Sequence, residues 1–372
     1  MKILHINALD SRYGCSIRAR AIRDAFRAAG HCAHYAEPNC GDPRQAETTF
    51  QSGDNVSGWA KVARRFAQLA REESFDALFV SKPILPTLPA MIAAGRRGAA
   101  VLLDCDDLDY EFQSSAPRRL AALAAFRQGC RAADAILTHN RRLAGIIKES
   151  TGKQAVIIPQ GVDAALFDPA GFDREAVREK LGLGGKKVLG LVATMTTGGA
   201  RAFPELLEAV AAPLKESENG MLLVVGGGPL LEEMRRMAKQ KLGDVARFAG
   251  RVAHEDVPQY VAAMDVGLLY MLDDDADAAR SSMKLLEYLA MGTPVAARLV
   301  GHAAEDFAGM CATASDGEDF ARVCIDCLRD PPQRGLHSYA IRRDRSWAAL
   351  TPMLNDALLK AVDARDRRIR KK

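Results

Sequence analysis

Short apolar segments alternate with longer amphipathic segments along almost the whole chain. The short segments have the length and the apolar character of strands that are buried on both faces. The longer segments repeat apolar residues with the period of a helix. Since parallel strands are joined by crossovers that are usually helices, this alternation predicts a parallel sheet covered on both sides. In the first series the expected strands are Ile3–Asn7, Ala77–Val80, Val101–Asp104, Ala135–Thr138 and Ala155–Ile158.

The alternation starts again after residues 159–187, a segment rich in Gly, Pro and Asp that we interpret as a linker. A chain of 372 residues also fits two domains better than one. We expect an α/β fold with two Rossmann-like domains, residues 1–165 and 166–345. A C-terminal helix and basic tail, residues 346–372, should pack back on the first domain. The expected strands of the second series are Lys187–Ala193, Met221–Val225, Val245–Phe248, Val266–Tyr270 and Pro294–Ala297.

Composition and charge narrow the class of protein. With 48% hydrophobic and 26% charged residues the chain is an ordinary globular one, and its net charge of +4 is too weak and dispersed for nucleic-acid binding. The first residues lack the features of a signal peptide, and eight scattered cysteines are typical of a reducing compartment. We therefore expect a cytoplasmic protein. Peripheral contact with the inner membrane face is a second option, because Trp59–Arg71 and the tail combine basic and apolar residues.

The most informative segment for function is Ser281–Val295, which reads SSMKLLEYLAMGTPV. Serines are suited to open a helix here, and Gly292 is suited to end it before a strand. Lys284 and Glu287 are three positions apart and therefore share one face of this helix. By itself the pattern is also that of a surface ion pair on an amphipathic helix.

This segment resembles the nucleotide-binding signature of the retaining GT-B glycosyltransferases, the group 1 family that includes sucrose synthase and bacterial mannosyltransferases. In that family the signature reads K-L-L-E-Y-x-A-x-G-x-P-V, and its glutamate accepts hydrogen bonds from both ribose hydroxyls of the donor nucleotide. The resemblance assigns this role to Glu287, whose carboxylate can accept two hydrogen bonds at once. It also implies that the helix N-terminus, at Ser281 and Ser282, holds the donor diphosphate.

Three further segments resemble the same family in the same order, so the resemblance covers about residues 133–297. It implies the GT-B fold, in which the two domains face each other across a deep cleft. It also implies sugar transfer from a nucleoside diphosphate sugar with retention, and neither a metal nor a cofactor besides the donor. Gly227 lies in the family's glycine–proline loop and is a candidate donor ligand. The segments are Ala135–Thr138 through Ile157–Asp163 with Phe167–Pro169, Leu223–Pro229, and Phe248–Val266.

The chain departs from the family pattern at two positions of the donor site. The family often carries another glutamate eight positions before the one that matches Glu287, and this chain has Ala279 at that position. In the family this earlier glutamate contacts the donor sugar, so the residue that makes this contact here stays open. The acidic run 273–277 is one candidate to replace it. Thr196 stands where the family has a diphosphate-binding arginine. Arg201 falls at the position of the family's lysine, and Arg280 can supply the missing charge.

Two loops of the first domain carry further candidates. Gly14 follows the first strand, where the family has a glycine loop whose backbone approaches the sugar and the diphosphate. Asp106 takes the place of the family's histidine near the transferred sugar. It belongs to the run Asp104–Asp109, which leaves open an acceptor contact, a divalent metal or a structural loop. His139 closes another strand, where a structural role is the commoner one.

The resemblance implies a mechanism in which fixed cations stabilise the leaving diphosphate, and we assign Lys284 and Arg201 to this role. Asp106 is the third catalytic candidate, and the leaving phosphate itself is expected to take the acceptor's proton. The expected partners are a nucleoside diphosphate sugar and a sugar, lipid or small-molecule acceptor. Two alternatives stay open: a non-catalytic relative that binds nucleotide sugars, and a sugar-nucleotide 2-epimerase of the same fold.

Overall fold

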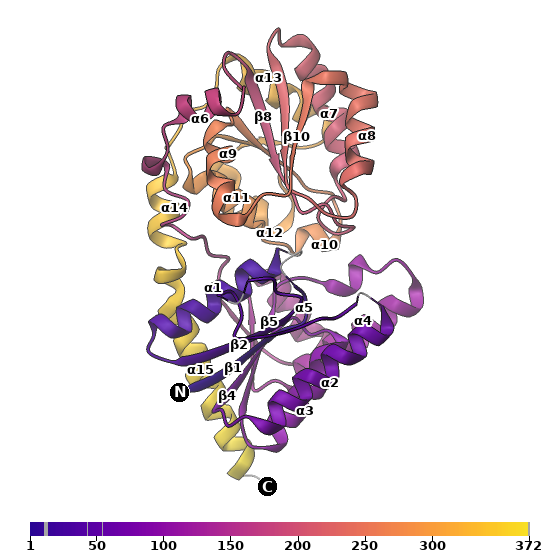
Figure 1. The fold of residues 1–372 in the computed structure, drawn as a ribbon, viewed down its shortest axis with the longest axis vertical. Helices are drawn as coiled ribbons and strands as arrows, with labels where there is room; N and C mark the ends of the chain where they lie inside the picture. Colours follow the sequence, from indigo (N-terminus) through magenta and orange to yellow (C-terminus); the bar gives the residue numbers. More distant parts are fainter. Residues whose placement is uncertain (11–13, 43, 54, 371–372) are drawn as a thin grey trace. The chain divides into compact units, whose positions relative to one another are not determined.

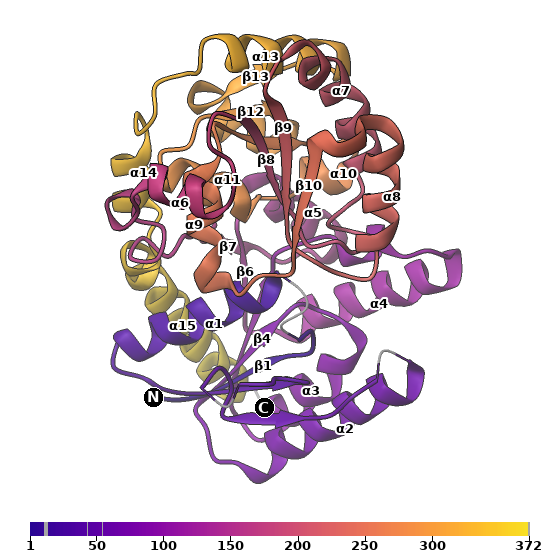
Figure 2. The same cartoon turned by 45° about the horizontal axis from the view of Figure 1, so that its top comes forward.

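The computed structural model describes residues 1–10, 14–42, 44–53 and 55–370 (Figure 1 and Figure 2). They form two compact units, each built around one parallel sheet. Unit 1 comprises Met1–Pro159, Ala279–Ser281 and Trp347–Lys372, and unit 2 comprises Gln160–Ala278 and Ser282–Ser346. The expected fold class, α/β with two Rossmann-like domains, is confirmed. Within the described residues, no helix combines the length and the apolar character needed to cross a membrane.

Unit 1 contains a seven-stranded sheet in the order β3-β2-β1-β4-β5-β6-β7. The central strands β4 and β5 are buried along their whole length. Alternate residues of β5 enter two separate cores, Val101 and Leu103 on one side and Ala100 and Leu102 on the other. The strands are β1 Lys2–Asn7, β2 Cys32–Pro38, β3 Thr48–Phe50, β4 Ala77–Ser81, β5 Ala100–Cys105, β6 Ala135–Thr138 and β7 Ala155–Ile157.

Helices α2 to α5 pack on one face of this sheet, and α1 and α15 pack on the other. In Figure 1, α15 (yellow) and α1 (indigo) lie side by side, although they come from opposite ends of the chain. The C-terminal helix is therefore part of the core of unit 1. The helices are α1 Cys15–Ala28, α2 Val56–Glu72, η1 Leu85–Thr87, α3 Leu88–Arg96, η2 Asp109–Phe112, α4 Ala116–Ala132, α5 Arg141–Thr151 and α15 Trp347–Arg370.

Unit 2 contains a six-stranded sheet in the order β10-β9-β8-β11-β12-β13. Helices α7, α8 and α13 cover one face, and α6, α9, α11, α12 and α14 cover the other. The strands are β8 Lys187–Val192, β9 Gly220–Val225, β10 Ala246–Gly250, β11 Val266–Tyr270, β12 Val295–Arg298 and β13 Ala312–Ala314. The helices are η3 Pro169–Gly171, α6 Arg174–Lys180, α7 Phe203–Glu216, α8 Leu231–Leu242, η4 Gly243–Val245, η5 His254–Asp256, α9 Val257–Ala263, α10 Asp275–Ala278, α11 Met283–Ala290, α12 Gly301–Phe307, η6 Ala308–Met310, α13 Gly317–Arg329 and α14 Ser338–Asp344.

Several elements, among them β2, β3 and β13, are not predicted from the sequence. β2 contains His34 and Glu37 and so does not read as an apolar run. Partners on other elements satisfy both side chains: His34 hydrogen-bonds the Thr48 hydroxyl of β3 at 2.8 Å, and Arg20 of α1 lies 3.3 Å from Glu37 Oε1. β3 and β13 have only three residues each, and helix α6 lies within the expected linker, residues 159–187.

Replacing Leu354 by Ala should lower the free energy of unfolding of unit 1 by about 2–5 kcal/mol, because it empties a fully buried position on α15. Leu359 lies on the same helix with 47% of its surface exposed, and Leu359→Ala should change the value by less than about 0.5 kcal/mol. Urea unfolding followed by tryptophan fluorescence reports on unit 1, which contains both tryptophans, Trp59 and Trp347. Equal effects of the two variants would contradict the docking of α15.

Candidate functional site

Helix α11 is held against the sheet of unit 2 by Tyr288. The Tyr288 ring is fully buried and packs over Gly267 of β11, where a Cβ would come within 2.7 Å of the ring. The backbone N–H of Val192, at the end of β8, donates a hydrogen bond of 2.7 Å to the Tyr288 hydroxyl. These two contacts set the rotation of α11 and thereby the position of Glu287, the preceding residue.

The Glu287 side chain is buried and has no hydrogen-bond partner within the described part of the chain. The residue is only 4% exposed, and no described residue donates a hydrogen bond to its carboxyl group. Burial raises the pKa of Glu287 to about 8, and the charge of Lys284, one helical turn earlier, opposes this shift. Because a buried polar group without a partner is costly, such a group is typical of a site that a ligand completes.

The N-terminus of α11, just over one turn before Glu287, has polar groups without hydrogen-bond partners among the described residues. Ser282 is the N-cap residue, but its hydroxyl caps no backbone N–H group. Its Oγ atom is buried without a partner among the described residues. The first turn contains no acidic side chain, and Lys284 adds a positive charge there. Free N–H groups and the helix dipole favour an anion at such a position.

Arg201 is engaged by the acidic run 273–277. It forms an ion pair with Asp274, and its Nη1 atom lies 3.5 Å from Asp277 Oδ1. The run is not an open loop, because its second half forms α10. The charge of Arg201 is therefore compensated within unit 2 by the same carboxylates that the sequence offered as a substitute at Ala279.

The glycines around Gly227 pack closely against backbone. Gly226 and Gly228 have φ angles of +132° and +154°. A Cβ on them would come within 1.9 Å of the Ala193 carbonyl oxygen and 2.4 Å of the Met195 carbonyl oxygen, respectively. Only glycine fits these two positions. Packing thus accounts for the glycine run, and donor contact at Gly227 stays a prediction.

A buried lysine holds together the acidic loop that follows β5 in unit 1. Lys82 Nζ lies 2.7 Å from Asp106 Oδ1. The same nitrogen lies 3.1 Å from carboxylate oxygens of both Asp107 and Asp109. The Lys82 side chain is 4% exposed, and its φ of +69° is strained for a residue with a side chain. An ammonium group therefore occupies the point at which three carboxylates converge.

Ion pairing outweighs burial at this cluster. Burial disfavours the charge of Lys82, but the three aspartates raise its pKa well above its ordinary value. At Asp106 burial raises the pKa, Lys82 opposes the shift, and the neighbouring carboxylates add to it. Burial raises the pKa of Asp109 as well, so both Asp106 and Asp109 hold a proton more tightly than an ordinary aspartate.

The neighbouring polar residues are used inside unit 1. Arg18 makes a two-pronged ion pair with Asp104, with distances of 2.8 and 2.9 Å. His139 bonds the Asp106 carbonyl oxygen through Nε2, and its Nδ1 lies 2.8 Å from the Asn140 amide. Burial and the charge of Arg18 lower the pKa of His139 to about 4. His139 is therefore a neutral structural side chain at neutral pH.

Arg280 joins the same cluster. Its Nε atom lies 3.6 Å from Asp107 Oδ1, and its guanidinium lies over the Phe112 ring, 5.2 Å from the centroid. Ala279 is 1% exposed and belongs to the apolar core of unit 1, so the position of the family's other glutamate is closed off. Ser281, the other expected helix-opening serine, also groups with unit 1, whereas Ser282 groups with unit 2.

Gly14 is the N-cap residue of α1. Its φ of −59° and ψ of −25° are open to any residue, so the backbone does not require glycine there. The next side chain, Cys15, is close enough to Lys82 to feel its charge: burial raises the pKa of the thiol, and Lys82 opposes the shift. Gly14 therefore begins a helix beside the lysine cluster, and its contact with a donor stays a prediction.

The structure thus gathers the expected residues into two groups. Glu287, Lys284 and Ser282 lie at one end of α11 in unit 2, and Asp106 and Arg280 lie around Lys82 in unit 1. Lys82 is absent from the candidates drawn from the sequence. The available signal was its place directly after a buried strand, at the sheet edge where ligands of parallel sheets bind.

Replacing Lys82 by Met should lower the free energy of unfolding of unit 1 by about 3–5 kcal/mol at neutral pH, because it leaves the buried Asp106 and the half-buried Asp107 and Asp109 without their shared counter-charge. The loss should shrink at acidic pH, where the aspartates take up protons. Tryptophan-monitored urea unfolding measures both effects. Lys148→Met, at an exposed lysine of the same unit, should be neutral. A Lys82→Met protein as stable as this control would refute the role of the cluster.

Glu287 should make the stability of unit 2 depend on pH. Its pKa in the folded chain, about 8, lies above its ordinary value of 4.5. Protonation therefore stabilises the fold, and this contribution is complete below pH 4.5 and lost as the pH rises towards 8. Relative to Glu287→Gln, the wild-type unfolding free energy should fall by up to about 1.4 kcal/mol per pH unit in this window. Glu233→Gln, at an exposed position, serves as the control, and a flat difference for Glu287→Gln would contradict the burial.

Sequence comparison relates unit 2 to a known family. Residues 186–330 match the model of the family described as Glycosyl transferases group 1. The chain is 30% identical over 203 residues to a GDP-mannose-dependent alpha-(1-6)-phosphatidylinositol monomannoside mannosyltransferase of Mycolicibacterium smegmatis. This alignment covers 51% of the chain and 50% of the relative, so the chain spans about half the length of the curated relative that it matches.

Structural comparison extends the likeness to both units. The chain is similar to sucrose-phosphate synthase from Thermosynechococcus elongatus, with a TM-score of 0.73, 17% identity, and coverage of 95% of this chain and 97% of the other. It is also similar to Anabaena Alr3699/HepE in complex with UDP, with a TM-score of 0.73, 16% identity, and coverage of 96% and 99%. At these identities the likeness concerns the fold. The family model and the mannosyltransferase alignment thus relate part of the chain, residues 186–330 for the model, to the group 1 glycosyltransferases.

Proposed function

We propose that this protein is a glycosyltransferase that moves a sugar from a nucleoside diphosphate sugar to a hydroxyl of an acceptor, with retention and without a metal or cofactor. The observation that carries the proposal is the buried Glu287 carboxyl, which lies one turn from the uncapped start of α11 and has no hydrogen bond from any residue that the structure describes. The match of residues 186–330 to a glycosyltransferase family supports it.

The chemistry of a nucleotide diphosphate complements these groups. The two ribose hydroxyls donate to the Glu287 carboxylate and so offset the cost of its burial. The diphosphate accepts hydrogen bonds from the Ser282 hydroxyl and from the first N–H groups of α11, and Lys284 neutralises part of its charge. The mannosyltransferase relative uses GDP-mannose by name, whereas the similar Anabaena structure contains UDP, so both bases are candidates.

In the proposed reaction, the bond between the anomeric carbon and the diphosphate oxygen breaks, and its electron pair stays on the diphosphate. The acceptor oxygen forms the new bond to that carbon on the same face, and its proton passes to the leaving phosphate. Negative charge grows on the diphosphate, so Lys284 and the α11 N–H groups stabilise the transition state more than the ground state. Arg201 contributes when the diphosphate competes with Asp274 for its guanidinium.

On the acceptor side, we propose that Asp106 in unit 1 accepts a hydrogen bond from the reacting hydroxyl. The mannosyltransferase relative acts, by its name, on a phosphatidylinositol monomannoside. A membrane glycolipid is therefore our first candidate among sugar, lipid and small-molecule acceptors. With such an acceptor the protein works in the cytoplasm in peripheral contact with the inner membrane face.

Glu287→Ala should weaken the binding of the cognate nucleoside diphosphate by about 10- to 100-fold, because two hydrogen bonds to a charged acceptor are lost. Isothermal titration with UDP, GDP and ADP identifies the cognate nucleotide first and then measures the loss. Glu233→Ala, which removes an exposed glutamate of the same unit, should bind as wild type does. Equal affinities of the two variants would refute the assignment of Glu287.

Turnover separates the proposed activity from its alternatives. A matching nucleotide sugar with a panel of acceptors should give a product with the anomeric configuration of the donor, visible by NMR, and Lys284→Ala should slow it. Epimerised donor in the absence of any acceptor would show a 2-epimerase instead. Nucleotide binding with neither transfer nor donor hydrolysis would show a non-catalytic binding protein.

A further inference from the structure

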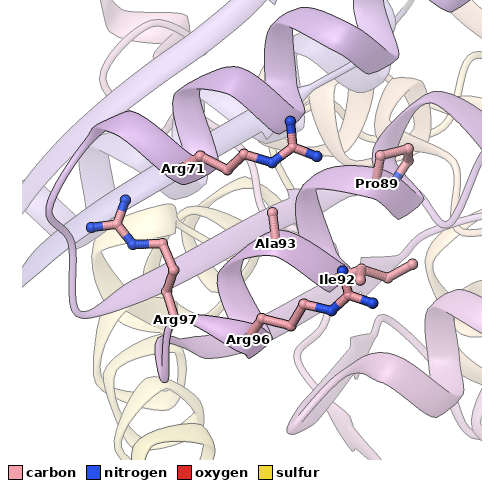
Figure 3. Close-up of a pocket in the computed structure, with 6 residues that line it drawn as sticks. All are labelled: Arg71, Pro89, Ile92, Ala93, Arg96 and Arg97. Carbon is pink, nitrogen blue, oxygen red and sulfur yellow. The ribbon is translucent and has the colours of Figure 1, made fainter.

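A groove edged by three arginines lies between α2 and α3 of unit 1 (Figure 3). It has a volume of about 400 Å³. Figure 3 shows Arg71 and Arg96 on opposite sides of Ala93, with Arg97 at one end. Its lining consists of Arg71 from α2 and of Pro89, Ile92, Ala93, Arg96 and Arg97 from α3 and its end, and it includes no acidic residue.

The three arginine side chains are exposed and free of ion pairs. Arg71, Arg96 and Arg97 form no side-chain hydrogen bond or salt bridge within the described part of the chain. Both helices end here, and helix C-termini attract cations, which accounts for arginines at these positions. It does not account for three cations around a shared apolar floor. Such charges repel one another and attract an anion.

The exposed face of α2 continues the same chemistry away from the groove. Lys61 and Arg64 are exposed on this helix, about three and two turns before Arg71, and neither has a salt-bridge partner among the described residues. At the start of the helix Val56 is 87% exposed and Trp59 is 39% exposed. A helix with cations along its outer face and an exposed aromatic residue is typical of contact with a membrane surface.

The exposed apolar side chain of Ile92 lies within the groove itself. Half of its surface, 50%, is exposed, although it sits among the arginines. Helices α2 and α3 cover the same face of the sheet, so their outer sides point in the same direction (Figure 1). Exposed apolar groups among cations fit an anionic lipid surface better than a small soluble anion, because the acyl boundary covers the apolar groups.

The groove lies at the opposite edge of the sheet from the lysine cluster. The ends of α2 and α3 lead into the first residues of β4 and β5, whereas Lys82 and Asp106 follow the last residues of these strands. The end of α15 borders the same region, since Arg368 donates to the Ala99 carbonyl oxygen just after α3. Binding here therefore leaves the sheet edge with Asp106 free.

We propose that this groove binds the phosphate of an anionic phospholipid and that α2 rests on the membrane beside it. The three guanidinium groups supply charged donors for the phosphate oxygens. Ile92 and Trp59 enter the boundary between the headgroups and the acyl chains. The inference rests on the membrane contact proposed above and does not depend on sugar transfer.

The test is co-sedimentation of the full chain with vesicles of phosphatidylcholine alone or mixed with phosphatidylglycerol. Wild type should bind the mixed vesicles, bind pure phosphatidylcholine weakly, and be released by high salt. A basic side chain near an anionic surface contributes about fivefold to partitioning, so Arg71→Ala, Arg96→Ala and Arg97→Ala combined should weaken binding about 100-fold. Equal binding by wild type and this triple variant overturns the proposal.

A charge-matched variant is the control. Arg236→Ala, Arg322→Ala and Arg329→Ala combined remove three exposed arginines of unit 2, and this protein should bind the mixed vesicles within about threefold of wild type. A drop equal to that of the groove variant would show dependence on net charge alone and would overturn the site. Arginine-dependent stabilisation by inorganic phosphate without any vesicle binding would identify a soluble anion as the ligand and likewise overturn the lipid assignment.

Nucleotide titration of the same three proteins keeps the two proposals apart. All three should melt at the same temperature and bind the cognate nucleotide equally, because the groove lies in unit 1 and Glu287 lies in unit 2. Vesicle binding that depends on the groove, in a protein that binds no nucleotide, would count against sugar transfer and leave the groove intact. A groove variant that binds nucleotide but not vesicles supports the docking site.

Discussion

Burial of both faces of a parallel sheet is the constraint on which the rest of this structure depends. Strands such as β4 and β5 have no solvent-facing side, so their polar chemistry is confined to the residues that follow them. Parallel strands end at one common edge, and loops from distant parts of the sequence therefore meet there. Lys82 and the aspartates after β5 are neighbours for this reason. A charge at such an edge borders a core and needs a partner from the protein or from a ligand.

The two units differ in what partners the polar groups at this edge of the sheet. In unit 1 the protein supplies the partners: Lys82 takes three aspartates, and Arg18 takes Asp104. In unit 2 the carboxyl of Glu287 and the hydroxyl of Ser282 are buried without hydrogen bonds from the described residues. A carboxyl that burial holds partly protonated at neutral pH is poised to ionise when donors reach it. This contrast is why unit 2 supports the proposal of a nucleotide site.

Unit 1 separates two kinds of charge along its strands. The carboxyl edge carries the acidic residues 104–109 with their internal counter-charges. The amino edge carries Arg71, Arg96 and Arg97, exposed beside apolar Ile92. A compensated acidic edge suits hydroxyl groups, and an uncompensated basic edge suits phosphate. With a lipid acceptor, the basic amino edge would hold the protein at the membrane surface. The same membrane would supply the acceptor to the acidic carboxyl edge.

The sequence by itself determined the alternating α/β pattern, with β6 and β11 placed to the residue, because a run of apolar residues between turns records burial locally. It also singled out Glu287 through a helix that fits a family signature. Only the tertiary structure decided that β2 is a strand, since its Glu37 pairs with Arg20 of α1 and its His34 with Thr48 of β3. The same holds for Lys82, whose three aspartates follow a different strand, and for α15, whose apolar face is buried against residues at the other end of the sequence. Contacts between distant residues depend on how the strands are ordered in the sheet, and that order leaves no local trace in the sequence.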